Sequence, residues 1–118
     1  MSLKTPKRLE RDKRSPAHKR APRQEAEVAK RTGSKLTAGS GNQTTKGDCR
    51  KRGVVRIECK TTSAKSFSVT MDTINKLETA AAISNELPIL VIEFLKGGKP
   101  WRSVCVTTEE LLDRVQDL

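Results

Sequence analysis

Asp48, Glu58 and Lys60 are the side chains whose types and spacing best suit reactive chemistry, and the residues between them predict a β-hairpin. Residues 54–60 alternate between apolar and charged side chains, as in a strand with one buried face. Gly53 can adopt the positive φ of a tight turn, and a hairpin centred there pairs residues whose numbers sum to 106. Asp48 is then opposite Glu58, with Cβ atoms about 4.5–5.5 Å apart.

Two opposed carboxylates repel each other, and a divalent cation between them would offset that repulsion. Mg²⁺ takes oxygen ligands at about 2.0–2.1 Å, commonly one or two carboxylates together with water and phosphate oxygens. Lys60 lies on the face of Glu58, about 6.6–6.8 Å along the strand, where its ammonium group would reach a metal-bound water or a phosphate. The alternative is a solvated strand face, with Asp48 as an ordinary turn residue.

The segment before the hairpin predicts a short helix that starts near Pro22 and stops at Gly33. Glu25 shares one face of this helix with Val28 and Ala29, so its carboxylate is predicted to face inward. An inward carboxylate is costly unless it is paired or bound to a metal, which adds Glu25 to the candidate site. The alternative is a first-turn acid that only stabilises the N-terminus of the helix.

The other elements predict an α/β fold with a mixed central β-sheet flanked by helices. Residues 33–48 have the composition of a loop, with a short extended piece at 35–37. Residues 66–69 alternate like a third strand, Asp72 can cap a helix that ends before Pro88, and residues 89–95 form an apolar run typical of a buried strand. Residues 101–106 predict a further strand, and 107–110 resemble a capping box that opens a last helix. The predicted order is α-β-β-β-α-β-β-α.

Charge is unevenly distributed along the 118 residues, which carry 24 Lys and Arg against 14 Asp and Glu. Residues 1–23 hold nine basic and two acidic side chains and three of the five prolines, which predicts a disordered basic arm ahead of one domain, 24–118. Such an arm would contact phosphates, or act only as a solubilising or targeting stretch. No apolar run approaches the roughly 20 residues of a membrane span, and no secretory signal is predicted, so we expect a soluble intracellular protein.

Several short motifs follow one another in a recognisable order: Gln24-Glu25, Gly39-Ser40-Gly41, Lys46-Gly47-Asp48 and Ile57-Glu58-Cys59-Lys60. Over roughly residues 22–95 the chain resembles the PD-(D/E)XK nuclease superfamily, in particular its small Holliday-junction-resolvase-like and phage-encoded endonucleases. One departure is Gly47, where the superfamily motif has Pro.

The resemblance implies a restriction-endonuclease-like core and a role for each matching residue. Asp48 and Glu58 would bind Mg²⁺ or Mn²⁺, the backbone carbonyl of Cys59 would be a further ligand, and Lys60 would be the catalytic lysine. Glu25 matches the helix glutamate, as a catalytic residue and a further candidate ligand, and Ser40 matches a loop serine near the scissile phosphate.

The expected function is that of a metal-dependent endodeoxyribonuclease, an enzyme that hydrolyses phosphodiester bonds, selective for branched DNA such as Holliday junctions. The resemblance implies a homodimer in the cytoplasm of a bacterial or archaeal cell, with a viral gene as an alternative source. Basic residues around the site would contact the DNA backbone: Lys35, Lys46, Arg50, Lys51, Arg52, Arg56 and Lys65. Two alternatives stay open, a non-catalytic nucleic-acid-binding protein and a general or sequence-selective nuclease acting on linear DNA.

Overall fold

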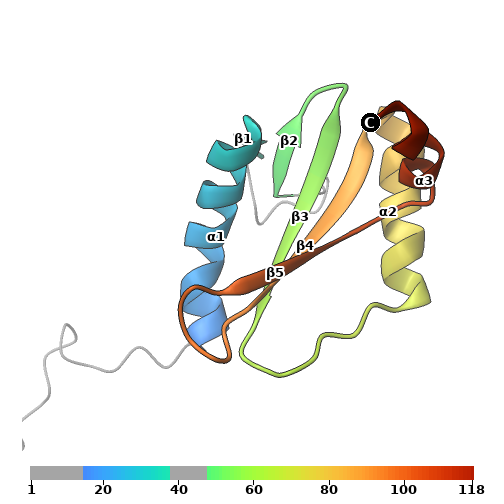
Figure 1. Cartoon of the computed structure of the whole chain (residues 1–118). Coiled ribbons are helices and arrows are strands. Elements are labelled where there is room, and N and C mark those ends of the chain that lie inside the picture. The colour runs from blue at the N-terminus through green and yellow to red at the C-terminus, as the bar shows by residue number, and fades with distance from the viewer. Residues whose placement is uncertain (1–14, 38–47) are drawn as a thin grey trace, which may run out of the picture.

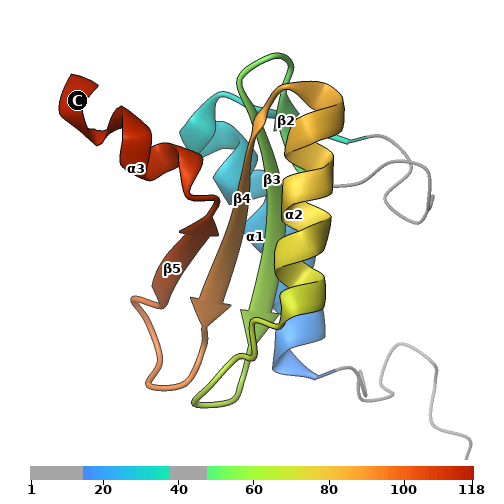
Figure 2. The same cartoon turned by 90° about the vertical axis from the view of Figure 1, so that its right-hand side faces the viewer.

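The computed structural model describes residues 15–37 and 48–118, and within them five strands form one sheet with a helix against each face (Figures 1 and 2). The strands are β1 (Lys35–Leu36), β2 (Cys49–Lys51), β3 (Val55–Thr62), β4 (Leu87–Phe94) and β5 (Arg102–Thr107), adjacent in that order. The helices are α1 (Pro16–Thr32), α2 (Met71–Ser84) and a short α3 (Glu110–Arg114), followed by the 3₁₀ helix η2 (Val115–Asp117).

The sheet is mixed, because one of its four strand pairs is parallel. β1, β2 and β3 form an antiparallel meander, β3 and β4 are parallel with Val55 beside Leu87 and Thr62 beside Phe94, and β5 returns antiparallel to β4. A parallel pair needs a crossover connection, which α2 supplies. The expected α/β class and mixed sheet are confirmed, and the described elements follow the order α-β-β-β-α-β-β-α before the final η2.

The core consists of two apolar layers, one on each face of the sheet. α1 packs over the first layer and α2 over the second, as Figure 2 shows with α2 in front of the sheet and α1 behind it. The first layer contains Ala29, Cys49, Ile57 and Cys59, and the second contains Leu77, Leu90 and Ile92. The alternation predicted for residues 54–60 is confirmed, because Ile57 and Cys59 lie buried beneath α1.

The third predicted strand is wrong, because residues 66–69 have no regular structure. The first strand of the meander is instead β1, at the extended piece expected within residues 35–37. Both sides of β3 are already occupied, by β2 and β4, so a strand after β3 has no neighbouring place in the sheet. Phe67 alone of this segment packs on the core, whereas Val69, which would share its face in a strand, is exposed.

The start of the first helix is also corrected, from the neighbourhood of Pro22 to Pro16. Ser15 caps α1 by accepting a hydrogen bond from the His18 N–H at 3.1 Å, and Pro16 takes the first turn, where its missing N–H costs nothing. Pro22 lies inside the helix. The expected boundary between arm and domain at residue 23 therefore falls within α1, and residues 1–14 lie outside the described part of the chain.

An ion pair explains why the helix reaches so far back. The Arg20 guanidinium donates to the carboxylate of Glu93 on β4, with Nε 2.7 Å from Oε1, and it also pairs with Glu27. Glu93 is buried, and Arg20 lies 4.2 Å from the ring centroid of Trp101, which Lys99 also approaches. These contacts fix the first half of α1 to β4 and to the segment before β5.

The remaining helices differ from expectation mainly at their ends. Thr70, and not Asp72, caps α2 by accepting from the Thr73 N–H at 3.2 Å. The expected capping box before α3 does not form, because the Thr107 hydroxyl donates instead to the Pro88 carbonyl at 2.8 Å. In the part of the chain that the structure describes, no helix is long and apolar enough to cross a membrane.

Candidate functional site

The β2–β3 hairpin has the predicted register, and Gly53 has a φ of 77° in its turn. Cys49 pairs with Ile57 and Lys51 with Val55, so the paired numbers sum to 106 as expected. The ladder ends at Cys49, so the pairing expected between Asp48 and Glu58 is not formed.

Asp48 instead binds the edge of β3 that becomes exposed where β2 stops. Its N–H donates to the Ile57 carbonyl at 2.7 Å, and its carboxylate Oδ2 accepts from the Cys59 N–H at 2.7 Å. Because the N–H and C=O of one strand residue point to the same side, the carbonyl of Cys59 is directed toward this same edge. One backbone carbonyl and one carboxylate therefore meet at the end of the hairpin.

A cavity of about 290 Å³ opens at this edge, between α1 and β3. We call it the carboxylate cavity. It brings together three of the four expected catalytic residues, Glu25 from α1, Asp48 from the start of β2 and Lys60 from β3. Its other lining residues are Ser15, Ala17, His18, Ala21, Cys59 and Thr61.

The electrostatics of the carboxylate cavity show that its two acids interact. Burial raises the pKa of Glu25 above its usual value, and the negative charge of Asp48 raises it further, whereas the positive charge of Lys60 acts in the opposite direction. The prediction that Glu25 faces inward is confirmed, because it is partly buried beside Asp48.

Glu58, the fourth expected residue, lies away from this pair of acids. It lines a different cavity, of about 150 Å³, with residues of α2 and the segment before it. Lys60 lines both cavities, and its Nζ lies 3.7 Å from Glu58 Oε1. Glu58 is separated from Asp48 because side chains alternate along a strand and Glu58, like Lys60, lies on the α2 face of β3. Asp48 lies beyond the last paired residue of β2.

The donor atoms at the carboxylate cavity suit a hard divalent cation. Within residues 15–37 and 48–118, no group of three or more His, Cys, Asp and Glu side chains is arranged to hold a metal ion. Mg²⁺, however, commonly binds through only one or two carboxylates, with water and phosphate completing its coordination, and carbonyl oxygens suit Mn²⁺ as well. Glu25, Asp48 and the Cys59 carbonyl are the oxygen donors that could hold such a cation, which would offset the repulsion between the two acids.

Two of the expected DNA-contacting residues, Arg50 and Arg56, are bound to a buried acid. Arg50 Nε lies 2.8 Å from both carboxylate oxygens of Glu86, and Arg56 Nε lies 3.3 Å from Oε1. The Gly53 N–H donates to Glu86 Oε2 at 2.8 Å. Burial alone would raise the pKa of Glu86, but these three donors outweigh it and lower the pKa to about 2.

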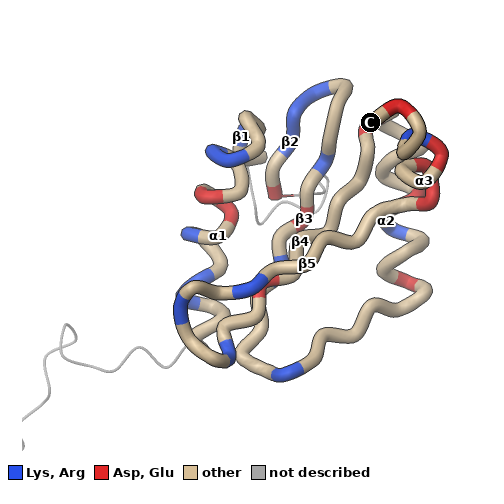
Figure 3. The backbone as a smooth tube through the Cα atoms, in the orientation of Figure 1, with Lys and Arg blue, Asp and Glu red and all other residues tan. Residues whose placement is uncertain are grey.

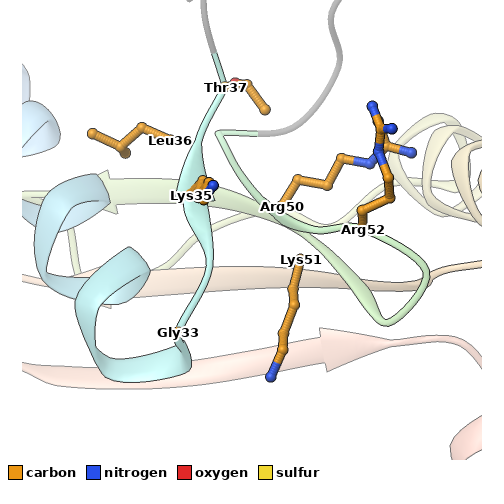
Figure 4. Close-up of a pocket in the computed structure, with 7 residues that line it drawn as sticks. All are labelled: Gly33, Lys35, Leu36, Thr37, Arg50, Lys51 and Arg52. Carbon is orange, nitrogen blue, oxygen red and sulfur yellow. The ribbon is translucent and has the colours of Figure 1, made fainter.

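Other basic residues surround a second and wider hollow, which we call the basic cavity. It has a volume of about 610 Å³ and is lined by Gly33, Lys35, Leu36, Thr37, Arg50, Lys51 and Arg52 (Figure 4). Figure 4 shows the side chains of Arg50 and Arg52 extending in one direction and that of Lys51 in the opposite direction. Figure 3 shows Lys and Arg residues following β2 into the turn of the hairpin. No acidic residue lines this cavity within the described part of the chain.

The remaining expected contacts lie elsewhere. Lys65 is exposed in the segment after β3. Ser40 and Lys46 lie outside the described residues, so their expected roles remain predictions.

Two residues of the carboxylate cavity were missed by the sequence analysis, His18 and Thr61. His18 was assigned to the arm because the helix was expected to start at Pro22. The pair Ser15-Pro16 is a recognisable start signal, and it would have placed His18 in the first turn of a helix. Thr61 continues the apolar face of β3, but its sequence pattern carries no signal for a ligand.

Comparison with protein-family models, with curated proteins and with solved structures found no significant match to this chain.

Proposed function

We propose that this protein is a metal-dependent endodeoxyribonuclease selective for branched DNA such as Holliday junctions. One observation carries the proposal: Glu25 from α1, Asp48 from just before β2 and Lys60 from β3 line a single cavity beside the part of β3 that β2 does not pair. These are three of the four residues to which the resemblance to PD-(D/E)XK nucleases gives a catalytic role, and the fourth, Glu58, lines the neighbouring cavity.

In this proposal each residue of the site has a distinct task. Glu25, Asp48 and the carbonyl of Cys59 would hold Mg²⁺ or Mn²⁺, which when bound would polarise a phosphate and lower the pKa of a bound water. The hydrogen bond from the Cys59 N–H fixes the orientation of the Asp48 carboxylate. Lys60 supplies positive charge next to the phosphate as negative charge develops on it. Glu58, 3.7 Å from the Lys60 ammonium, positions that group.

The distribution of charge supports DNA as the substrate. The whole chain has a formal charge of +10, and the basic cavity presents Lys35, Lys51 and Arg52 with no acid among its described lining residues. Arg52 follows Asp48 by four positions, which corresponds to about 13 Å of extended chain. A DNA backbone that passes the carboxylate cavity would therefore reach these cations, which would neutralise phosphates without reading base sequence.

Selectivity for branched DNA rests on size and on symmetry. A single small domain whose cations contact phosphates has little surface with which to read bases, so the shape of the DNA is the feature it would recognise. A twofold dimer would place two sites on two strands. Val104, Leu112 and Val115, on β5, α3 and η2, are exposed apolar side chains that a second copy of the chain could cover.

A second candidate function is non-catalytic binding of nucleic acid. The contact that favours it is the hydrogen bond between Asp48 and the Cys59 N–H, because this bond satisfies a backbone donor that β2 no longer pairs and gives Asp48 a purely structural role. A third candidate, a nuclease acting on linear DNA, differs only in its substrate.

Cleavage assays separate the three functions. Labelled linear, flapped and four-way DNA of equal length would be incubated with Mg²⁺, with Ca²⁺ and with a chelator. We expect Mg²⁺-dependent paired nicks in the four-way junction, and binding in Ca²⁺ that exceeds that of linear DNA by more than tenfold, or about 1.4 kcal/mol.

The variants Asp48→Asn and Lys60→Ala should abolish cleavage and keep binding in Ca²⁺. Asp113→Asn, an exposed acid on α3, is the matched control and should cleave normally. Cleavage by either site variant at the parent rate would contradict the assignment. Binding without cleavage by the parent would favour non-catalytic nucleic-acid binding. Equal cleavage of linear and branched DNA would favour a nuclease that acts on linear DNA.

A further inference from the structure

β5 lies at one edge of the sheet, and no described strand pairs with its outer side. The strand has six residues, contains no proline and pairs continuously with β4, and its residues 102–105 are exposed. The opposite edge strand, β1, has only two residues. An edge strand presents a row of backbone N–H and C=O groups to which another strand can add, and a long edge without proline or a bulge is the most open to such pairing.

Exposed apolar side chains are concentrated on β5 and on the segment that follows it. Val104 on β5 is 49% exposed, and Leu112 and Val115, on α3 and η2, are 70% and 52% exposed. Figure 2 shows α3 extending from the end of β5, away from β4. Apolar surface of this kind is typical of a contact with another protein chain.

The two ends of β5 carry opposite charge. Lys99 and Arg102 are exposed at the start of the strand. Glu109 and Glu110 are exposed just after its end, about 17 Å farther along, because five residue steps separate the first and last residues of β5. When two identical strands pair in antiparallel fashion, the start of each lies beside the end of the other. The basic end of one copy would then meet the acidic end of its partner.

We infer that β5 pairs antiparallel with β5 of a second copy of this chain, which joins the two sheets into one. The partner is a second copy because the charges of this edge are complementary to themselves about a twofold axis. The pairing centres on Val104, which lies opposite the partner's Val104, so that the two side chains cover each other. Paired numbers then sum to 208, which places Glu109 beside the partner's Lys99.

The pairing itself does not depend on the proposed function, but its consequence for cleavage rests on it. The twofold axis is perpendicular to the joined sheet, so both carboxylate cavities open on the same side of it. The two β3 strands are separated by five strand spacings, or about 24 Å across the sheet. The dimer therefore presents two candidate sites that can act on two strands of one DNA molecule.

Sedimentation equilibrium of the parent and of Val104→Lys tests the pairing. The parent should dimerise, and the variant should dimerise more than tenfold more weakly, because it places two like charges directly opposite each other. Ile83→Lys makes the same kind of change at an exposed position of α2, where the side chain is 81% exposed, and should dimerise like the parent.

A charge exchange tests the direction and register of the strands, and it does not require Val104→Lys to fold. Glu109→Lys and Lys99→Glu should each weaken the dimer by about two- to fivefold, and the double variant should restore it. Such a rescue cannot arise within one chain, because these two residues lie at opposite ends of β5.

Amide hydrogen exchange separates strand pairing from contact between side chains alone. N–H groups alternate in direction along a strand, so every second N–H of β5 points away from β4. These outward N–H groups should exchange more slowly in the dimeric parent than in Val104→Lys. The N–H groups that point toward β4 should exchange equally in both proteins.

The outcomes distinguish this inference from the proposed function. A parent that stays monomeric at every concentration, a dimer that is unchanged in Val104→Lys, or a double variant that fails to restore the dimer overturns the inference. If a monomeric parent cleaves DNA in Mg²⁺, the inference fails and the assignment of a metal-dependent nuclease stands. If the parent dimerises through β5 but cleaves no DNA, the inference stands and the nuclease proposal fails.

Discussion

Glu86 lies at the junction of α2 and β4 with its side chain fully buried, and its replacement by glutamine should destabilise the protein strongly. Three donors from the hairpin converge on it: the Gly53 N–H and the guanidinium groups of Arg50 and Arg56. Glutamine keeps the shape of the side chain but removes the charge, so two partly buried arginines would lose the carboxylate that they share. Breaking one partner of a buried ion pair typically costs about 3–5 kcal/mol.

The pKa of Glu86 gives an independent value for the same effect. The hairpin donors lower this pKa from 4.5 to about 2, despite the opposing effect of burial. Each pKa unit corresponds to about 1.4 kcal/mol, so ionised Glu86 contributes about 3 kcal/mol to folding at neutral pH. Because the folded pKa is the lower one, this contribution is complete above pH 4.5 and is lost as the pH falls toward 2.

Urea unfolding of the parent and of Glu86→Gln between pH 2 and pH 7 tests both values. The variant should be less stable by about 3 kcal/mol at pH 7 and by under about 0.5 kcal/mol near pH 2. Glu78→Gln makes the same chemical change at an exposed position of α2 and should leave stability unchanged within about 0.5 kcal/mol. A Glu86→Gln protein as stable as the parent at pH 7, or a difference that does not shrink in acid, would refute this account of the cluster.

Three further predictions concern charge. Lys51→Ala should weaken DNA binding and reduce the slope of log K against log salt by about 0.9, as filter binding would measure, without changing stability. Arg50→Ala should instead lower the free energy of unfolding, measured in urea, because Arg50 pairs with Glu86. Deleting residues 1–14, which hold six basic side chains, should flatten the salt slope by about 0.9 for each phosphate that the segment neutralises, and an unchanged slope would mean that this segment does not touch DNA. In the metal-free protein, Asp48→Asn should lower the pKa of Glu25, because the negative charge of Asp48 raises it. NMR titration of the Glu25 carboxyl in the parent and the variant measures this change. An identical Glu25 pKa in both proteins would mean that the two acids do not interact.

The features that were predictable from the sequence depend on local rules. The hairpin register follows from the alternation of residues 54–60 and from the freedom of Gly53 to take a positive φ, both of which act over a few residues. The inward orientation of Glu25 followed from helix periodicity, which is also local. The α/β class followed from the order of such segments.

The features that were not predictable depend on contacts between distant parts of the chain. Arg20 and Glu93 are 73 residues apart, and the ion pair that ties the first half of α1 to β4 has no local signal in the sequence. Glu86 is 36 residues from Arg50, and in the sequence it is an ordinary acid before a strand. The alternation at residues 66–69 was misleading, because the sheet has no free place beside β3. Glu58 lies on its predicted face of β3. It does not pair with Asp48, because the pairing of β2 with β3 ends one residue earlier, at Cys49 and Ile57.

The chain leaves β1 and returns to β2 at almost the same point, since the Thr37 N–H donates to the Asp48 carbonyl at 3.1 Å. The backbone on either side of residues 38–47 is thus joined independently of how many residues lie between. Doubling the length of such a connection costs only about 0.6 kcal/mol in closure entropy. Related sequences could therefore lengthen, shorten or rewrite this stretch while the Asp48 carboxylate stays where the Cys59 N–H holds it.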